Sequence, residues 1–252
     1  MSFILHTMDL PIYFISDIHL SLNLTDREKQ RQKKLFDFFN EIKNTGGTLV
    51  INGDLFDFYF EYKNVIPKVF FKFYHELMKV RESGIEVHYV LGNHDFWVKD
   101  FITEQLFDKT YFSDTSFEVN NTKIYVTHGD GYLSWDRGYR ALRKIIRSKL
   151  FINLYGMLHP RIGYAIGNFV SKKGGNYLHS AERNKKISDE MSIHAKKKID
   201  QGFDYFISGH YHQAEDRKLN DGNMIILGDW LSFFTYAKYD GSEIKLHKWK
   251  ES

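Results

Sequence analysis

Residues 86–95 read EVHYVLGNHD, a short apolar run that ends in side chains able to bind a metal. The run is rich in β-branched and aromatic residues, which is typical of a buried strand. We expect Gly92 to let the backbone turn sharply after this strand. Asn93 is also common in turns, but a turn alone does not require His94 and Asp95. The segment is therefore either a capped turn or a metal site, and motifs elsewhere in the sequence distinguish the two.

The same pattern recurs along the chain. Apolar runs end at Asp17 and His19 (IYFISDIH), Asp54 (TLVINGD), His128 and Asp130 (KIYVTHGD), His210 and His212 (FDYFISGHYH), and Asp229 (NMIILGDW). Helical patterns at Arg27–Asn44 and Val69–Gly84 separate the first runs, which predicts a layered α/β fold, whereas the last two runs are expected to be antiparallel neighbours. Loops at the carboxyl ends of strands meet at one edge of such a sheet, so we expect the polar side chains to converge there.

The residue types indicate which metal this edge would bind. The chain has no Cys, which excludes disulfides and thiolate sites. Carboxylate, amide and imidazole ligands suit Mn²⁺, Fe²⁺ or Zn²⁺ better than Ca²⁺ or Mg²⁺. The candidate ligands are too many for one ion, so we predict two ions about 3.5–4 Å apart that share one carboxylate, an arrangement suited to in-line attack of an activated water at phosphorus. These ligands are Asp17, His19, Asp54, Asn93, His128, His210 and His212.

The interval between His128 and His210 is longer than the others and contains amphipathic helical patterns. We interpret residues 132–180 as a helical cap inserted into a single domain that spans residues 1–252. Residues 137–198 hold 15 Lys/Arg and 3 Asp/Glu, a formal charge of +12 within an overall +3, so the remainder carries −9. This basic block is either a solvated helical surface or a site for an anionic partner.

The motifs DIH, GDLFD, GNHD, HGD and GHYH resemble, in this order, the five motifs of the calcineurin-like metallophosphoesterases. The resemblance implies a four-layer fold of two packed mixed β-sheets flanked by helices. It also implies that Asp54 bridges two ions, the first held with Asp17, His19 and His212 and the second with Asn93, His128 and His210. His94 would then lie near the scissile phosphate as electrophile or proton donor, oriented by a hydrogen bond that it donates to Asp95. Asp57 and Asp130 are expected to support ligands.

Within this family, the chain resembles the UDP-2,3-diacylglucosamine pyrophosphatases of lipid A biosynthesis. The stretches that carry the likeness are GDLFDFYFEY, HGDGYLSWDRGYRALRK, LHPRIGYAIGNFVSKKG and LGDW. It implies hydrolysis of the substrate's diphosphate to UMP and 2,3-diacylglucosamine 1-phosphate, usually with Mn²⁺, and substrate contacts from Arg137, Arg140, Arg161, Ser171, Lys172, Lys173 and Asn176. One departure is that the best-known branch of these enzymes has Arg at the position of His94.

The cap suits a lipid-linked nucleotide sugar as partner. Its basic side chains can neutralise a diphosphate, and its apolar positions can either line a slot for acyl chains or pack the cap onto the core. No run of about 18 apolar residues and no signal peptide is visible, so we expect a cytoplasmic protein bound peripherally to the inner membrane, with no stable protein partner. Two alternatives remain: a phosphodiesterase of nucleic acids or cyclic nucleotides, which the apolar cap fits poorly, and an inactive binding scaffold, which the complete ligand set argues against.

Overall fold

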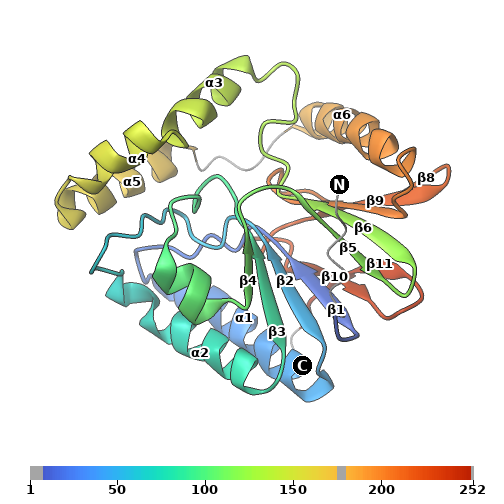
Figure 1. Ribbon diagram of the computed structural model, residues 1–252, viewed down its shortest axis with the longest axis horizontal. Helices are drawn as coiled ribbons and strands as arrows, with labels where there is room; N and C mark the ends of the chain where they lie inside the picture. The colour runs from blue at the N-terminus through green and yellow to red at the C-terminus, as the bar shows by residue number, and fades with distance from the viewer. Residues whose placement is uncertain (1–7, 175–179, 251–252) are drawn as a thin grey trace.

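The computed structural model describes residues 8–174 and 180–250 of the 252-residue chain. Two mixed β-sheets form its centre, one of six strands and one of five, and helices lie outside both sheets (Figure 1). Three buried apolar clusters fill the space between these layers: one between the sheets and one beneath the helices on each side. The predicted fold of two packed mixed sheets flanked by helices is therefore confirmed.

The larger sheet has the strand order β11–β10–β1–β2–β3–β4, in which β1 to β4 are parallel, β10 runs antiparallel to them, and β11 runs antiparallel to β10. Side chains alternate between its faces, so Tyr13 and Ile15 contact the helices while Ile12 and Phe14 face the second sheet. Burial on both faces explains the uninterrupted apolar runs in the sequence. The strands are β1 (Ile12–Ile15), β2 (Thr48–Asn52), β3 (Glu86–Val90), β4 (Lys109–Tyr111), β10 (Thr235–Tyr239) and β11 (Ile244–Lys248).

Helices α1 (Asp26–Thr45) and α2 (Phe71–Glu82) cover the outer face of this sheet. The hydroxyl of Thr25 caps α1 by accepting a hydrogen bond from the backbone N–H of Glu28, and the helix stops at Gly46 with a φ of 73°. The two helices predicted over 27–44 and 69–84 are thus confirmed, with the second preceded by the 3-10 turn η1 (Lys68–Phe70). A π-helical turn, η2 (Phe101–Leu106), precedes β4.

The second sheet has the order β5–β6–β7–β9–β8, and helix α6 (Ala181–Ile199) covers its outer face. The expectation that the two runs around 205–208 and 222–227 are antiparallel is wrong, because β7 and β9 are parallel neighbours. Strand β8 comes between β7 and β9 in the sequence but lies at the edge of the sheet, beyond β9. It runs antiparallel to β9, so β9 can begin at the same end of the sheet as β7 and run parallel to it. The strands are β5 (Thr115–Val119), β6 (Thr122–Thr127), β7 (Tyr205–Ser208), β8 (Ala214–Leu219) and β9 (Gly222–Leu227).

Between β6 and α6, the segment predicted as a cap contains three helices, α3 (Arg137–Ile146), α4 (Lys149–Gly156) and α5 (Pro160–Gly174). They lie over the loops that follow β2 and β3, apart from the helices that cover the sheets (Figure 1). An aromatic seat of Phe58, Phe60 and Tyr62 receives Tyr155 of α4 and Tyr164 of α5. Tyr164 donates a hydrogen bond to the backbone oxygen of Phe60, at 2.6 Å.

Two glycines of α5 allow this close approach. A Cβ at Gly163 would overlap the hydroxyl of Tyr62, and one at Gly167 would overlap the ring of Phe58. The opposite face of α5 carries Ile162, Ile166, Phe169 and Val170, which are exposed. Helix α5 is therefore apolar on two faces, of which the aromatic seat covers only one. Across residues 8–174 and 180–250, no helix combines the length and apolar character needed to cross a bilayer.

Candidate metal centre

The candidate ligands follow parallel strands, as the sequence predicted. Asp17 and His19 come after β1, Asp54 after β2 and Asn93 after β3, and in the second sheet His128 follows β6 while His210 and His212 follow β7. The fold gathers the carboxylate and imidazole groups into three triplets, in which every residue is buried except the half-buried His210 and His94: Asp17, His19 and His212; Asp54, His128 and His210; and His19, Asp54 and His94. Asn93 joins them through its side-chain oxygen, 3.2 Å from Nε2 of His128.

Backbone strain is concentrated at the same place. Among the described residues, eight that are not glycine have a positive φ, and five of these are Asp17, His19, Asp54, His210 and His212, with φ from 47° to 70°. Each such conformation costs about 1–3 kcal/mol and persists only where the surrounding structure enforces it, typically at functional sites. The strain is thus an argument for function that is independent of the side-chain chemistry.

The spacing of the donor atoms fits metal ions. Oδ1 of Asp17 lies 3.7 Å from Nε2 of His19 and 3.6 Å from Nε2 of His212, and no hydrogen bond reaches this buried oxygen. In the second triplet, Oδ2 of Asp54 lies 3.3 Å from Nε2 of His128, and the same oxygen is 3.7 Å from Nε2 of His19. Ligands about 2.1 Å from a shared ion are roughly 3.0–3.5 Å apart, so the 3.3 Å pair has this spacing and the other pairs are slightly wider. Each group contains three of the four residues of one predicted ligand set, and Asp54 approaches both groups.

Other carboxylates hold the imidazoles in place. Asp229, at the end of β9, lies 3.0 Å from Nδ1 of His212, and its second oxygen accepts hydrogen bonds from the backbone of residues 231–233. Oδ1 of Asp57 lies 3.5 Å from Nδ1 of His19, which agrees with its expected supporting role. Such contacts fix the orientation of the ring and leave Nε2 for a metal. Asp229 had no predicted role, although it follows a strand in the same Gly-Asp pattern as Asp54.

The expected hydrogen bond from His94 to Asp95 is not formed. The fully buried Asp95 carboxylate accepts hydrogen bonds from the backbone of Leu55 and Gly92 and from the hydroxyl of Tyr89. Nδ1 of His94 instead lies 2.6 Å from the backbone oxygen of Asp57. Asp95 therefore ties the loop after β3 to the loop after β2, and the ring of His94 is oriented by a carbonyl group.

Glycine is required at position 92 for a different reason from the sharp turn that we expected. Its φ is not positive, and a Cβ at this position would overlap the carboxylate and backbone nitrogen of Asp54. The missing side chain allows the two loops to approach closely enough for the backbone N–H of His94 to donate to Oδ1 of Asp54, at 3.0 Å. Gly92 is thus required for close contact and not for backbone freedom.

The predicted substrate residues lie at different places in the cap. Ser171 is buried near Asp57, so it lies next to the metal centre. Burial would raise the pKa of Asp57, but His19 mainly, with a smaller contribution from Ser171, holds it below its ordinary value. Arg140 contacts the backbone oxygen of Ser134, and Arg137 is exposed. Arg161 is ten residues before Ser171 on the same helix, about 15 Å along its axis. Lys172 and Lys173 belong to α5, and Asn176 lies outside the described residues.

Asp130 was expected to support a metal ligand. Its carboxylate pairs instead with side chains of the cap. Its carboxylate accepts hydrogen bonds from Arg143, Arg147 and Tyr139, all on or at the end of α3. Burial alone would raise the pKa of Asp130, but the charges of Arg147 and His128 hold it below its ordinary value. The loop that carries His128 is therefore joined to the cap by an ion-pair cluster.

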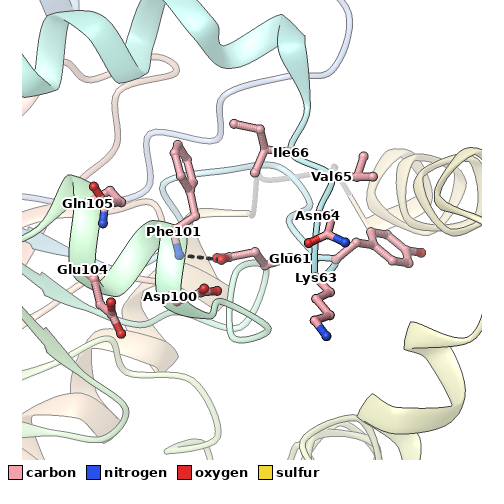
Figure 2. Close-up of a pocket in the computed structure, with 10 residues that line it drawn as sticks. Glu61, Lys63, Asn64, Val65, Ile66, Asp100, Phe101, Glu104 and Gln105 are labelled. Atoms are coloured by element: carbon pink, nitrogen blue, oxygen red, sulfur yellow. Dashed lines mark hydrogen bonds between the residues drawn. The ribbon is translucent and has the colours of Figure 1, made fainter.

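A separate surface cavity of about 300 Å³ lies between residues 61–66 and 100–105 (Figure 2). Figure 2 shows the carboxylate of Glu61 directed at the backbone nitrogen of Phe101, at 2.7 Å. The second carboxylate oxygen accepts from the backbone of Lys99, also at 2.7 Å. Both carboxylate oxygens of Glu61 are therefore used to hold the start of η2. The residues that line this cavity do not include a candidate metal ligand.

The metal-free site holds protons that a metal must displace. Burial lowers the pKa of His19, but the nearby carboxylates of Asp17, Asp57 and Asp54 outweigh it and raise the pKa to about 10. Burial likewise lowers the pKa of His128, and Asp54 raises it to about 10. The pKa of His210 is lowered to about 4 by burial and by His128. Near pH 8, His19 and His128 are thus charged before metal binding and His210 is neutral.

We therefore expect metal binding at pH 8 to release about two protons, because a ligating imidazole must be neutral. Isothermal titration of the metal-free protein with Mn²⁺ in buffers of different ionisation enthalpy measures this number. Affinity should rise with pH up to about 10, since both proton-binding pKa values lie near 10. The protons on His19 and His128 also stabilise the folded, metal-free protein. By linkage, this contribution is fully present below about pH 6.5 and is lost as the pH rises towards 10. A heat of binding that does not depend on the buffer would contradict the assignment.

Comparison with known proteins identifies the family of this chain. The chain is 29% identical over 95% of its length, and 98% of the relative's, to a UDP-2,3-diacylglucosamine hydrolase of Porphyromonas gingivalis. It is 28% identical over 87% of its length, and 90% of the relative's, to a protein of the same name from Neisseria meningitidis serogroup B. A solved archaeal phosphodiesterase aligns over 95% of this chain and 99% of its own at 15% identity, with a TM-score of 0.44. Residues 10–214 match the calcineurin-like phosphoesterase family, to which this chain belongs and whose members are metal-dependent hydrolases.

Proposed function

We propose that the protein hydrolyses the diphosphate of UDP-2,3-diacylglucosamine to give UMP and 2,3-diacylglucosamine 1-phosphate. The observation that carries the proposal is the placement of α5, which brings Ser171 of a basic, apolar cap beside Asp57 at the metal centre. A diphosphate could thus meet the metals while the acyl chains remain against the cap. The relatives that bear this enzyme name support the same substrate.

We further propose that two divalent ions, Mn²⁺ in the first place, occupy the site. Asp17, His19, Asp54 and His212 would hold one ion, and Asp54, Asn93, His128 and His210 the other. Oxygen and imidazole donors without sulfur suit Mn²⁺, Fe²⁺ and Zn²⁺. Bound in this way, the ions would supply an activated water and neutralise charge on the phosphoryl group.

His94 is the proposed catalytic residue of the chain itself. Its Nδ1 must carry a hydrogen, because the carbonyl oxygen of Asp57 at 2.6 Å can only accept. The other nitrogen, Nε2, is 4.0 Å from Oδ2 of Asp54 and therefore faces the metal centre. Donation of a proton from Nε2 to the leaving group requires both nitrogens to be protonated. As an electrophile, the same charged ring would stabilise negative charge on the phosphate.

The decisive experiment is an assay of the purified protein with Mn²⁺ and UDP-2,3-diacylglucosamine. We expect UMP to appear, a chelator to stop the reaction, and UDP-N-acetylglucosamine, which lacks the two long acyl chains, to react far more slowly. If the protein cleaves a simple phosphodiester but not the lipid, the metal centre is correct and the substrate is wrong. Cleavage of DNA with steep dependence on salt would favour the nucleic-acid alternative.

The seating of α5 gives a test of the cap. Ala at Gly167 would favour the helix intrinsically by about 1 kcal/mol, but its Cβ overlaps Phe58 and the overpacking costs about 1–3 kcal/mol. We expect Gly167→Ala to lower kcat/KM for the lipid about tenfold and to leave hydrolysis of bis(4-nitrophenyl) phosphate nearly unchanged. The matched control is Gly138→Ala in α3, where a Cβ meets nothing within 4 Å. Equal losses on both substrates would show that the seat supports the metal centre as well.

We also propose that the protein is cytoplasmic and binds the inner membrane peripherally through α3–α5. The support is an exposed apolar surface next to exposed basic residues such as Lys144, Lys149 and Arg161. The apolar side chains are Leu142, Ile145, Leu150, Leu154, Met157, Ile162, Ile166, Phe169 and Val170, and Met157 is 82% exposed. Apolar groups flanked by Lys and Arg suit an anionic bilayer surface. Co-sedimentation with phosphatidylglycerol vesicles should therefore exceed that with phosphatidylcholine vesicles and fall with Met157→Ser; equal recovery on both would contradict the proposal.

A further inference from the structure

Arg147 joins the cap to the two loops that carry the candidate ligands Asn93 and His128. It follows α3, and its guanidinium Nη2 donates to the backbone oxygen of Gly92, at 3.2 Å, and to Oδ2 of Asp130, at 2.9 Å. Gly92 immediately precedes Asn93, and Asp130 lies two residues after His128. The two candidate ligands connected in this way, Asn93 and His128, are themselves 3.2 Å apart. One side chain from the cap thus touches both segments that must hold these ligands in register.

Further contacts fix Arg147 against the loop after β3. Its guanidinium carbon lies 4.2 Å from the centre of the Phe96 ring, within range of a cation–π interaction. Beside it, Nε1 of Trp97 donates to the backbone oxygen of Ile146, at 2.8 Å. The Arg147 side chain is only 16% exposed, so it is not a mobile surface residue. The loop from Gly92 to Trp97 is therefore held to the end of α3 at both of its ends.

We infer that Arg147 is a positioning residue for the metal centre, which sets the distance between Asn93 and His128 through Gly92 and Asp130. The cap then does more than cover a substrate, because the binding geometry of one ion depends on it. The planar guanidinium can make both contacts at once, while a lysine ammonium on a flexible chain keeps the charge but not the fixed geometry. The inference rests on the proposed metal centre and is independent of which phosphoester is the substrate.

Binding of Mn²⁺ tests this directly in the full-length protein. Loss of a group that orients a metal ligand costs about 10–100-fold in metal affinity or activity. We expect Arg147→Met to weaken the weaker Mn²⁺-binding event by this factor in isothermal titration, to leave the tighter event unchanged, and to lower kcat more than it raises KM. Arg147→Lys should recover part of the affinity. Lys245→Met, at an exposed lysine of the edge strand β11 and outside the cap, removes the same charge and should change neither.

Several outcomes separate the possible explanations. If Arg147→Met binds both ions normally and only KM for the lipid rises, Arg147 merely anchors the cap and the inference is overturned. If the wild-type protein itself binds no Mn²⁺, the proposed metal centre fails instead. Thermal unfolding monitored by circular dichroism controls for loss of structure, and if Arg147→Met does not fold, the comparison of Arg147→Lys with the wild type decides: unchanged Mn²⁺ affinity would overturn the inference.

Discussion

Asp54→Ala is expected to lower turnover by about 10³-fold or more and to reduce the bound metal to less than two ions per chain. Asp54 belongs to the triplet with His128 and His210 and also approaches the other group, with Oδ2 3.3 Å from Nε2 of His128 and 3.7 Å from Nε2 of His19. A metal centre contributes several kcal/mol of transition-state stabilisation, and each 1.4 kcal/mol is about tenfold in rate. Steady-state kinetics and elemental analysis of the same preparation measure the two effects.

The charge and the shape of Asp54 can be separated. Burial would raise its pKa, but His128 and His94 hold it well below the ordinary value, so the carboxylate is charged. Asp54→Asn keeps the volume and an oxygen that can accept from the backbone N–H of His94, yet it lacks the negative charge. We expect Asp54→Asn to fold normally and to lose most of the metal. The control is Asp108→Asn, at a surface carboxylate paired with Arg81, which should retain both metal and activity. Full activity of Asp54→Asn would exclude a bridging role.

The positions of the candidate metal ligands could be predicted because a strand and the residue after it are adjacent in sequence. Burial on both faces makes β1, β2 and β3 apolar, and the edge where parallel strands end is a property of the topology alone. Asp17, Asp54 and Asn93 therefore identify the site without any knowledge of side-chain contacts. The short strands β4 and β5 and the final strands β10 and β11 carry no such signal, and they were not predicted.

The partners of these residues could not be predicted, because they depend on how separate loops approach one another. Asp95 is next to His94 in sequence, but its carboxylate turns inward to the backbone of Leu55, 40 residues away. Asp229 and His212 meet only because β9 lies parallel to β7, which was predicted wrongly. Arg147 was interpreted as one of many basic residues on a helix, and its contact with Gly92 spans 55 positions.

The second large effect is expected at His94, where two roles compete. His94→Ala should lower turnover by about 10²–10⁴-fold while both ions stay bound, if the ring acts on the phosphate as a general acid or electrophile. However, Nε2 of His94 also completes a possible metal-binding triplet with His19 and Asp54. A neutral ring with its hydrogen on Nδ1 would present a lone pair at Nε2, which is what a metal ligand needs.

The two roles differ in what accompanies the loss of rate. A catalytic His94 predicts full metal content in His94→Ala, an unchanged KM and loss of the limb of the pH–rate profile that reports the general acid. A ligand predicts weaker Mn²⁺ binding and partial recovery of turnover at high Mn²⁺ concentration. His94→Arg adds a decisive comparison, because arginine can stabilise phosphate charge but cannot release a proton at ordinary pH. If His94→Arg is active and His94→Ala is not, the residue acts as an electrophile; if both are inactive with both ions bound, proton donation is its role.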